Sequence, residues 1–329
     1  MMGSVATMTA GRAATRSGQP LARFAWATLA YNVAVILWGA YVRVTGSGAG
    51  CGNHWPLCNG EVVPQNAQTR TLIEFAHRIT SGLALVVVFT LLIWCWRKTT
   101  KGDWPRYSAL AAAILLLNEA LLGAGLVLFD YVAKNQSAGR AVFLSLHFGN
   151  TLLLLASLAL TAQWLSRNER RLRIAAKPWQ MTVVSAGLLA VVCVGITGAL
   201  AALGDTLFPA VSLRSSLTQD FAASSHVLLR LRWLHPVAAV VSGLYILWIF
   251  VTNPIREMRS RRKLFFLLAT LFTQLGLGAL NVVLLAPPWL QIVHLLVAEL
   301  FWITLVLISA ELLLEPRETA EVQVPSLLS

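Results

Sequence analysis

Four histidines occupy matching positions in the sequence and offer the chemistry of metal ligation. His77, His147, His235 and His294 each lie near the start of a long apolar stretch, where an ionisable side chain is costly without a partner. Singly, each could equally be a packed or interfacial histidine. Two imidazoles in each half of the chain suit axial ligation of heme iron, whereas a closed zinc site needs four ligands and a proton relay recruits carboxylates. The pattern predicts one bis-histidine heme in each half.

An acidic residue distinguishes the first histidine pair from the second. Glu74 stands three residues before His77, so a helix would place both side chains on one face, whereas the matching position before His235 is Arg232. This difference predicts chemistry at the first site, with Glu74 and His77 as catalytic candidates, and electron transfer at the second. Glu74 would shuttle protons or stabilise developing positive charge. The alternatives are a carboxylate that orients an imidazole, or an acid favoured at a helix start.

Two cysteines bracket a short polar segment between the first two apolar stretches. Cys51 and Cys58 are seven residues apart, which allows the chain to turn back and form a disulfide. A zinc site with His54 as third ligand is the alternative, but no fourth ligand stands at a suitable spacing. We favour the disulfide. Cys95 and Cys193 fall within apolar stretches and are expected to be small buried side chains.

Other polar residues near the stretches each allow two interpretations. Four arginines are candidate contacts for heme propionates, because guanidinium and carboxylate groups pair bidentately, although snorkelling to the interface explains each one equally well: Arg43, Arg78, Arg230 and Arg232. Glu119 and Glu299 are candidates for proton transfer or for hydrogen-bonded packing. His226 is expected to be an ordinary loop histidine.

The elements that must position these residues are membrane helices. The chain is 57% hydrophobic and 12% charged, which is too apolar for an ordinary soluble domain. It contains eight stretches near the ~20 residues that cross a bilayer as a helix. Strands of a membrane barrel would be shorter and alternating. The expected helices lie near 22–43, 72–96, 106–128, 141–165, 178–202, 230–252, 264–286 and 289–313.

The order of glycine-rich and histidine-containing stretches repeats after the fourth stretch. Gly123 and Gly125 correspond to Gly276 and Gly278, and small residues let a helix or a flat ligand approach closely. The prediction is an all-α polytopic membrane protein whose eight transmembrane helices form two pseudo-symmetric four-helix bundles. The expected segments are a cytoplasmic tail 1–21, an N-terminal half 22–165, a linker 166–177, a C-terminal half 178–313 and a cytoplasmic tail 314–329.

The net charge of +12 comes from basic residues in alternate loops rather than from a nucleic-acid-binding patch. This positive-inside distribution predicts that both termini are cytoplasmic and that the cysteine loop faces outward, in an oxidising compartment. We expect a plasma (inner) membrane protein that contacts anionic lipid, rather than an organellar inner-membrane protein. The main charged groups are Arg97, Lys98, Lys101 and Arg106; Arg167, Arg170, Arg171, Arg173 and Lys177; and Arg256, Arg259, Arg261, Arg262 and Lys263.

The combination of motifs resembles the heme A synthase family of cytochrome oxidase assembly. The carrying segments are GAYVRVTGSGAGCGNHWPLCNG, EFAHRITSG, SLHFGNTLLLLA, RLRWLHPVAAV and IVHLLVAELFW, and the likeness extends over the chain beyond its N-terminal tail. The resemblance implies an oxidoreductase that converts a ring methyl of heme O to the formyl group of heme A through an alcohol. It also implies a heme O synthase (farnesyltransferase) and the oxidase assembly machinery as partners; the electron acceptor is not implied.

The resemblance also assigns roles to individual residues. His77 and His147 would bracket heme O, with Glu74 beside the reacting ring, and His235 and His294 would ligate a permanent heme b. Some relatives carry a second cysteine pair in the outer loop of the C-terminal half, but residues 203–229 contain none; this loop is expected to cap the second heme. The alternative function is a di-heme b electron carrier without heme-modifying activity. A transporter is disfavoured because Pro-broken midplane helices are not evident.

Overall fold

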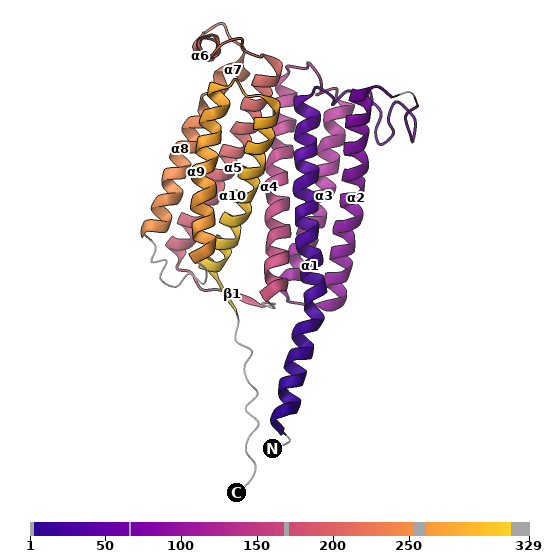
Figure 1. The fold of residues 1–329 in the computed structure, drawn as a ribbon, viewed down its shortest axis with the longest axis vertical. Helices are drawn as coiled ribbons and strands as arrows, with labels where there is room; N and C mark the ends of the chain where they lie inside the picture. Colours follow the sequence, from indigo (N-terminus) through magenta and orange to yellow (C-terminus); the bar gives the residue numbers. More distant parts are fainter. Residues whose placement is uncertain (1–2, 66, 168–170, 253–260, 317–329) are drawn as a thin grey trace.

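The apolar stretches form α-helices that run side by side between two ends of the molecule (Figure 1). The structure, a computed structural model, describes residues 3–65, 67–167, 171–252 and 261–316. Within these ranges eight helices are long and apolar enough to cross a membrane, which confirms the all-α polytopic class. The elements are α1 (Gly3–Val44), α2 (Thr69–Lys98), α3 (Trp104–Leu128), α4 (Ala138–Arg167), β1 (Leu172–Ile174), α5 (Pro178–Leu207), α6 (Leu213–Phe221), α7 (Val227–Leu231), α8 (Leu234–Thr252), α9 (Arg261–Val283), α10 (Pro288–Leu313) and β2 (Leu314–Pro316).

The helices pack in two groups that meet along α4 and α10. Helices α1 to α4 contact one another, and α5, α8, α9 and α10 form the second group. At the meeting surface the indole Nε1 of Trp302 on α10 donates to the backbone oxygen of Leu152 on α4 at 2.7 Å. Helix α10 is the most enclosed span, with 56% of its most apolar window buried, against 11% for α5. The two groups therefore share one apolar core, to which residues of both groups contribute.

The two ends of the bundle carry different connections, which we name for their contents. The disulfide end carries the Cys51–Cys58 loop together with α6 and α7, and the basic end carries β1 and β2 (Figure 1). At the basic end, β1 pairs antiparallel with β2, with Leu172 opposite Pro316. Glu311 near the end of α10 accepts hydrogen bonds from Arg167 at 2.5 Å and from Lys263. These contacts join segments of both groups.

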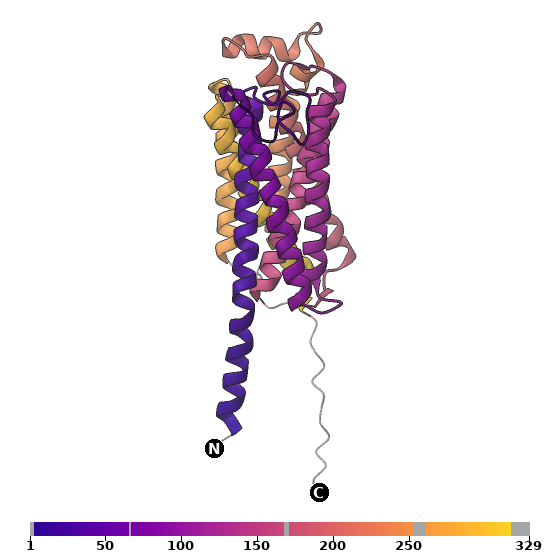
Figure 2. The same cartoon turned by 90° about the vertical axis from the view of Figure 1, so that its right-hand side faces the viewer.

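The structure departs from the expected boundaries in three places. Helix α1 begins at Gly3 rather than near residue 22 and extends beyond the other helices at the basic end (Figure 2), because its Ala-containing first part is compatible with helix. The segment 203–229, expected to be a loop, contains α6 and the beginning of α7; α6 is too short and too polar to show a hydropathy signal. The β1–β2 pair was not expected. Arg170, Arg256 and Arg259 of the predicted basic loops and residues 317–329 lie outside the described residues.

The two free cysteines differ, and one expectation is wrong. Cys95 on α2 is fully buried, as predicted. Cys193 on α5 is exposed at the helix surface. The physical reason is local: Cys193 lies on a face of α5 that no other described part of the protein covers, in a helix of whose most apolar window only 11% is buried.

Candidate functional site

The disulfide expected in the first polar loop is present. Cys51 and Cys58 are bonded with their Cα atoms 4.4 Å apart, and both residues are buried. Their thiols are therefore not ligands of a zinc ion with His54. Among the described residues, no group of three or more His, Cys, Asp or Glu side chains is arranged to hold a metal ion.

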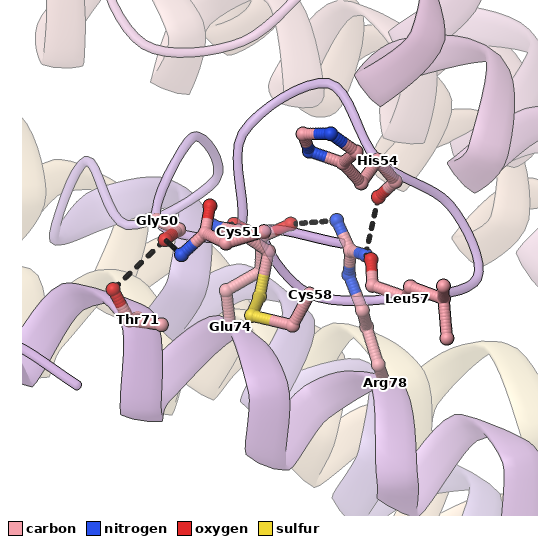
Figure 3. Close-up of polar contacts among 9 residues, drawn as sticks. Gly50, Cys51, His54, Leu57, Cys58, Thr71, Glu74 and Arg78 are labelled. Carbon is pink, nitrogen blue, oxygen red and sulfur yellow. Dashed lines mark hydrogen bonds and ion pairs between the residues drawn. A yellow bond between two sulfur atoms is a disulfide. The ribbon is translucent and has the colours of Figure 1, made fainter. Parts of the chain in front are cut away.

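Glu74 reaches from α2 into the disulfide loop. Its Oε2 accepts the backbone N–H of Cys51 at 2.8 Å, and its Oε1 lies 2.6 Å from Nη2 of Arg78 (Figure 3). The residue is only 4% exposed. Glu74 and His77 are both on α2, but this carboxylate is directed to the loop, and Nδ1 of His77 is buried without a hydrogen-bond partner.

Arg78 extends the attachment of the loop to α2. Its Nη1 donates to the backbone oxygens of His54 and Leu57 at 2.6 and 2.5 Å (Figure 3). One guanidinium thus joins Glu74 and both sides of the segment between the cysteines. Arginine suits this role because its planar group presents several fixed donors.

Close contact between the loop and α2 also depends on a glycine. A Cβ at Gly50 would lie 2.5 Å from the backbone oxygen of Arg70, so a side chain there would collide with main chain. The Thr71 hydroxyl donates to the Gly50 oxygen at 2.8 Å (Figure 3). The loop therefore covers the disulfide end of α2 through main-chain, carboxylate and disulfide contacts together.

Each of the four predicted histidines packs against a glycine of another helix. A Cβ built on the glycine would lie close to the imidazole Cε1 in every case: 3.0 Å for Gly39 and His77, 3.8 Å for Gly123 and His147, 2.8 Å for Gly198 and His235, and 3.4 Å for Gly278 and His294. The glycine and histidine pattern of the sequence thus becomes a repeated contact. The repeat is inexact, since the contact falls on Gly123 in one group and on Gly278, not Gly276, in the other.

In the C-terminal group, the spacing of the two imidazoles fits an iron bound between them. The ring centroids of His235 and His294 are 6.4 Å apart. Two imidazole nitrogens each about 2 Å from one metal ion would hold their ring centroids roughly 6 Å apart. Nδ1 of His235 lies 3.1 Å from the backbone oxygen of Val194, which leaves Nε2 as the ligand nitrogen. The amide Nε2 of Gln274 lies 3.1 Å from Nε2 of His294.

In the N-terminal pair, one nitrogen of each imidazole lacks a hydrogen bond from the described residues. Nδ1 of His77 and Nδ1 of His147 are buried and make no aligned hydrogen bond. His147 is close enough to His77 for a charge on one ring to affect the other. Such orphaned polar atoms in a native core call for an explanation, and a bound group is one. A carboxylate that sequence reasoning did not pair with this site, Glu119 on α3, has its Oε1 3.3 Å from Nδ1 of His147.

The cover of the C-terminal group is held by Arg232. Its Nη1 lies 2.9 Å from Oδ1 of Asp205 at the end of α5, and its Nη2 lies 2.6 Å from Oδ1 of Asp220 on α6. The residue is 7% exposed. Asp205 and Asp220 had no role in the sequence interpretation, because their partner is set by how α6 folds back over the bundle.

The four candidate propionate arginines differ in how many donors they have free. Arg78 and Arg232 donate to protein acceptors, and Arg230 is exposed. Arg43 near the end of α1 donates through Nη2 to Oε1 of Gln291 on α10 at 3.2 Å, whereas its Nη1 is buried without an acceptor. A buried cationic donor of this kind is suited to an anionic group that enters between the two helix groups.

Comparison with known proteins identifies a family and several relatives that this chain resembles. Residues 22–306 match the family model described as cytochrome oxidase assembly protein. The chain is 46% identical over 295 residues to the protoheme IX farnesyltransferase of Thermus thermophilus, which covers 89% of this chain but 48% of that protein. The chain thus spans about half the length of that relative. It is 44% identical over 126 residues to the heme A synthase of Alkalihalophilus pseudofirmus, with 38% of this chain and 40% of that protein covered. The corresponding values for the heme A synthase of Halalkalibacterium halodurans are 43% over 128 residues, 39% and 40%.

Proposed function

Because the chain belongs to the cytochrome oxidase assembly protein family, we propose that it is a heme A synthase. The reaction is the oxidation of a ring methyl of heme O to the formyl group of heme A through an alcohol, which makes the protein an oxidoreductase. The observation that carries the proposal is the fourfold contact of histidine on glycine, two in each helix group. Relatives named heme A synthase, similar over part of the chain, support it.

The two helix groups take different roles in this proposal. The N-terminal half, 22–165, holds the substrate heme between His77 and His147, and the C-terminal half, 178–313, holds heme b between His235 and His294. Imidazole ligation leaves the iron able to change oxidation state, which is the chemistry that heme supplies here. The glycines make room for flat groups beside the rings.

Glu74 and the disulfide loop act at the substrate site. The loop covers the disulfide end of α2, so it limits the access of water to a heme held by His77. Glu74 acts as the acid or base beside the reacting ring, with His77 as its catalytic neighbour. In the structure both Glu74 oxygens are engaged by Cys51 and Arg78, so this role requires the carboxylate to exchange one of these contacts for the substrate.

Propionate recognition belongs to the arginines near the disulfide end. Arg43 is the strongest candidate, because its Nη1 is buried without an acceptor. Arg78, Arg230 and Arg232 are further candidates, of which Arg78 and Arg232 would have to share donors that now bind protein oxygens. Guanidinium and propionate groups pair bidentately, which would orient the macrocycle as well as hold it.

The cellular setting follows from charge and from the relatives. The distribution of lysine and arginine supports a plasma (inner) membrane protein with the basic end and both termini on the cytoplasmic side. A heme O synthase is the expected supplier of substrate, in keeping with the name of the Thermus relative. The oxidase assembly machinery is the expected recipient of the product, and lipid surrounds the helices.

The test is an acid–acetone extraction of hemes from protein made with and without a co-expressed heme O synthase. Heme A and its alcohol precursor are expected only when heme O is supplied, and heme b in both preparations. Heme b alone in both preparations, from folded protein, would instead establish the di-heme electron carrier.

A further inference from the structure

A hydrogen-bonded carboxylate that has no part in the proposed chemistry lies beside one of the heme histidines. Glu119 on α3 has its Oε1 3.3 Å from Nδ1 of His147 on α4. The hydroxyl of Thr151 donates to the same Oε1, and Nδ2 of Asn150 donates to Oε2 at 2.5 Å. Both donors come from the turn of α4 that follows His147.

The amides around Glu119 fix the carboxylate in place. Nδ2 of Asn150 also donates to the backbone oxygen of Leu115 at 2.8 Å, and Oδ1 of Asn150 accepts from Nδ2 of Asn118 at 2.8 Å. Every hydrogen-bonding atom of this buried amide is therefore used, and its orientation is determined. Glu119 is held as an acceptor by a connected network, and Oε1 keeps capacity on the side of the imidazole.

The imidazole of His147 is poised for this acceptor. The two atoms are within 3.3 Å, although the ring is not aligned for a hydrogen bond in this conformation. At this separation, alignment of the ring rather than approach of the two helices is what the hydrogen bond from Nδ1–H to Oε1 requires. The histidine would then present Nε2 as its free nitrogen, because the bond made by one ring nitrogen sets the state of the other.

The other three heme histidines have other kinds of neighbour at the ring nitrogens for which a contact is recorded. Nδ1 of His235 lies beside a backbone oxygen, and His294 lies beside the amide of Gln274. Glu74, the acid next to His77 in sequence, binds the disulfide loop instead. Among the described residues, His147 is thus the heme histidine with a carboxylate against its ring.

We propose that Glu119 is a positioning residue for the heme of the N-terminal half, acting through His147. It would accept Nδ1–H of His147, leave Nε2 free to hold the iron, and give that imidazole added negative charge. Partners of this kind orient a ligand and raise its basicity, and extra charge donation favours the oxidised iron. The inference rests on the proposed ligation of heme by His77 and His147.

The test is a redox titration of protein purified from cells that also make heme O synthase, comparing Glu119→Gln with the wild type. The His147→Ala variant gives the signal of the C-terminal heme alone, so the N-terminal signal is obtained by difference. Loss of the charge is expected to change the relative stability of the two iron oxidation states at least tenfold, equivalent to a rise of about 59 mV for one electron. The C-terminal potential should not move. Glu299→Gln is the matched control: it removes another buried acid, whose oxygens have no hydrogen-bond partner among the described residues.

A second variant keeps the test decisive if Glu119→Gln loses the N-terminal heme. Thr151→Val is nearly isosteric and removes one donor to the carboxylate, leaving more of its negative charge for the imidazole. Its N-terminal potential is expected to fall, opposite to the rise in Glu119→Gln. An unchanged potential in either variant that keeps the heme, with conversion of heme O intact, overturns the role of Glu119 alone. If the His147→Ala variant has the same heme content as the wild type, the proposed ligation of heme by His147 is overturned as well.

Discussion

Glu74 and Arg232, each three residues before a histidine, both hold a loop in place, although their charges are opposite. In the N-terminal half Glu74 accepts from Cys51 and pairs with Arg78, and in the C-terminal half Arg232 pairs with two aspartates. Each side chain is nearly buried and holds a loop over the disulfide end of its histidine helix. The comparison shows that a covering loop is common to both halves, whereas the sign of the charge beneath it is not.

The covers differ in how they are held. The N-terminal loop is closed by a disulfide and lies directly on the main chain of α2, whereas the C-terminal cover is a short helix, α6, held by the ion pairs of Arg232. The histidines differ too, since His147 faces a carboxylate while its counterpart His294 faces the amide of Gln274. These differences fit a substrate site in the first half and a resident heme in the second.

Replacing Glu74 distinguishes a role in holding the disulfide loop from a role in catalysis. It is expected to have the largest effect on the conversion of heme O. Glu74→Gln keeps an oxygen for the Cys51 N–H but loses the charge. If Glu74 is the acid or base, conversion of heme O should fall about 10²- to 10⁴-fold, while heme b remains. Extraction of hemes over time measures the rate. Conversion at the wild-type rate would reduce Glu74 to the structural role that Arg232 has in the other half.

Replacing Arg232 tests the second cover. Arg232→Ala leaves the partly buried carboxylates of Asp205 and Asp220 without their cation, and breaking such a pair costs about 3–5 kcal/mol. We expect faster proteolysis between α5 and α8 and loss of heme b, with the N-terminal half unaffected. Arg214→Ala, at an exposed position on α6, is the control. Equal protease resistance in both variants would show that α6 is held by other contacts.

Removing the disulfide tests the first cover. A Cys51→Ser, Cys58→Ser double variant loses the cross-link between residues seven apart, worth about 2–3 kcal/mol in the chain-entropy account. The expected result is a more protease-sensitive loop and a less stable N-terminal half, with heme b retained. Thermal unfolding followed at each heme would detect it. A drop in heme b stability of the same size would mean that the halves are not independent in this respect.

Replacing the glycines that contact the histidines should have the smallest effect on heme binding. The loss of binding should be greater where a Cβ atom would lie closer to the imidazole. Cβ atoms at Gly198 and Gly39 would lie 2.8 and 3.0 Å from an imidazole carbon, so alanine there should cost about 1–3 kcal/mol of heme binding in its own half only. Gly276→Ala, with nothing within 4 Å, should be silent. Heme-binding titrations of the three variants make the comparison. Equal losses of heme binding at all three positions would contradict the idea that these glycines make room for the histidine rings.

The sequence predicted the features that depend on local composition. Apolar runs of membrane length indicated the eight long helices, and the spacing of Cys51 and Cys58 indicated the disulfide. The repeat of glycines and histidines was visible in the sequence, but the contact of each imidazole with a glycine of another helix, and the choice of Gly278 in α9, came only from the structure.

Features that depend on tertiary packing were not predictable in the same way. The helical spacing of Glu74 and His77 suggested a shared role, but the side chain turns to a loop that only the fold brings within reach. Glu119 and His147 are far apart in sequence and meet because α3 and α4 pack together. The burial of Cys193 was misjudged because hydropathy does not distinguish a helix facing lipid from one facing protein.

The most direct test of unequal halves is to identify the hemes extracted from His147→Ala and His294→Ala, each made with a heme O synthase. We expect His147→Ala to keep heme b and to lose heme O and heme A. His294→Ala should lose heme b and keep heme O in the N-terminal half. Loss of the same heme in both variants, or heme b retained in His294→Ala, would contradict the division of roles.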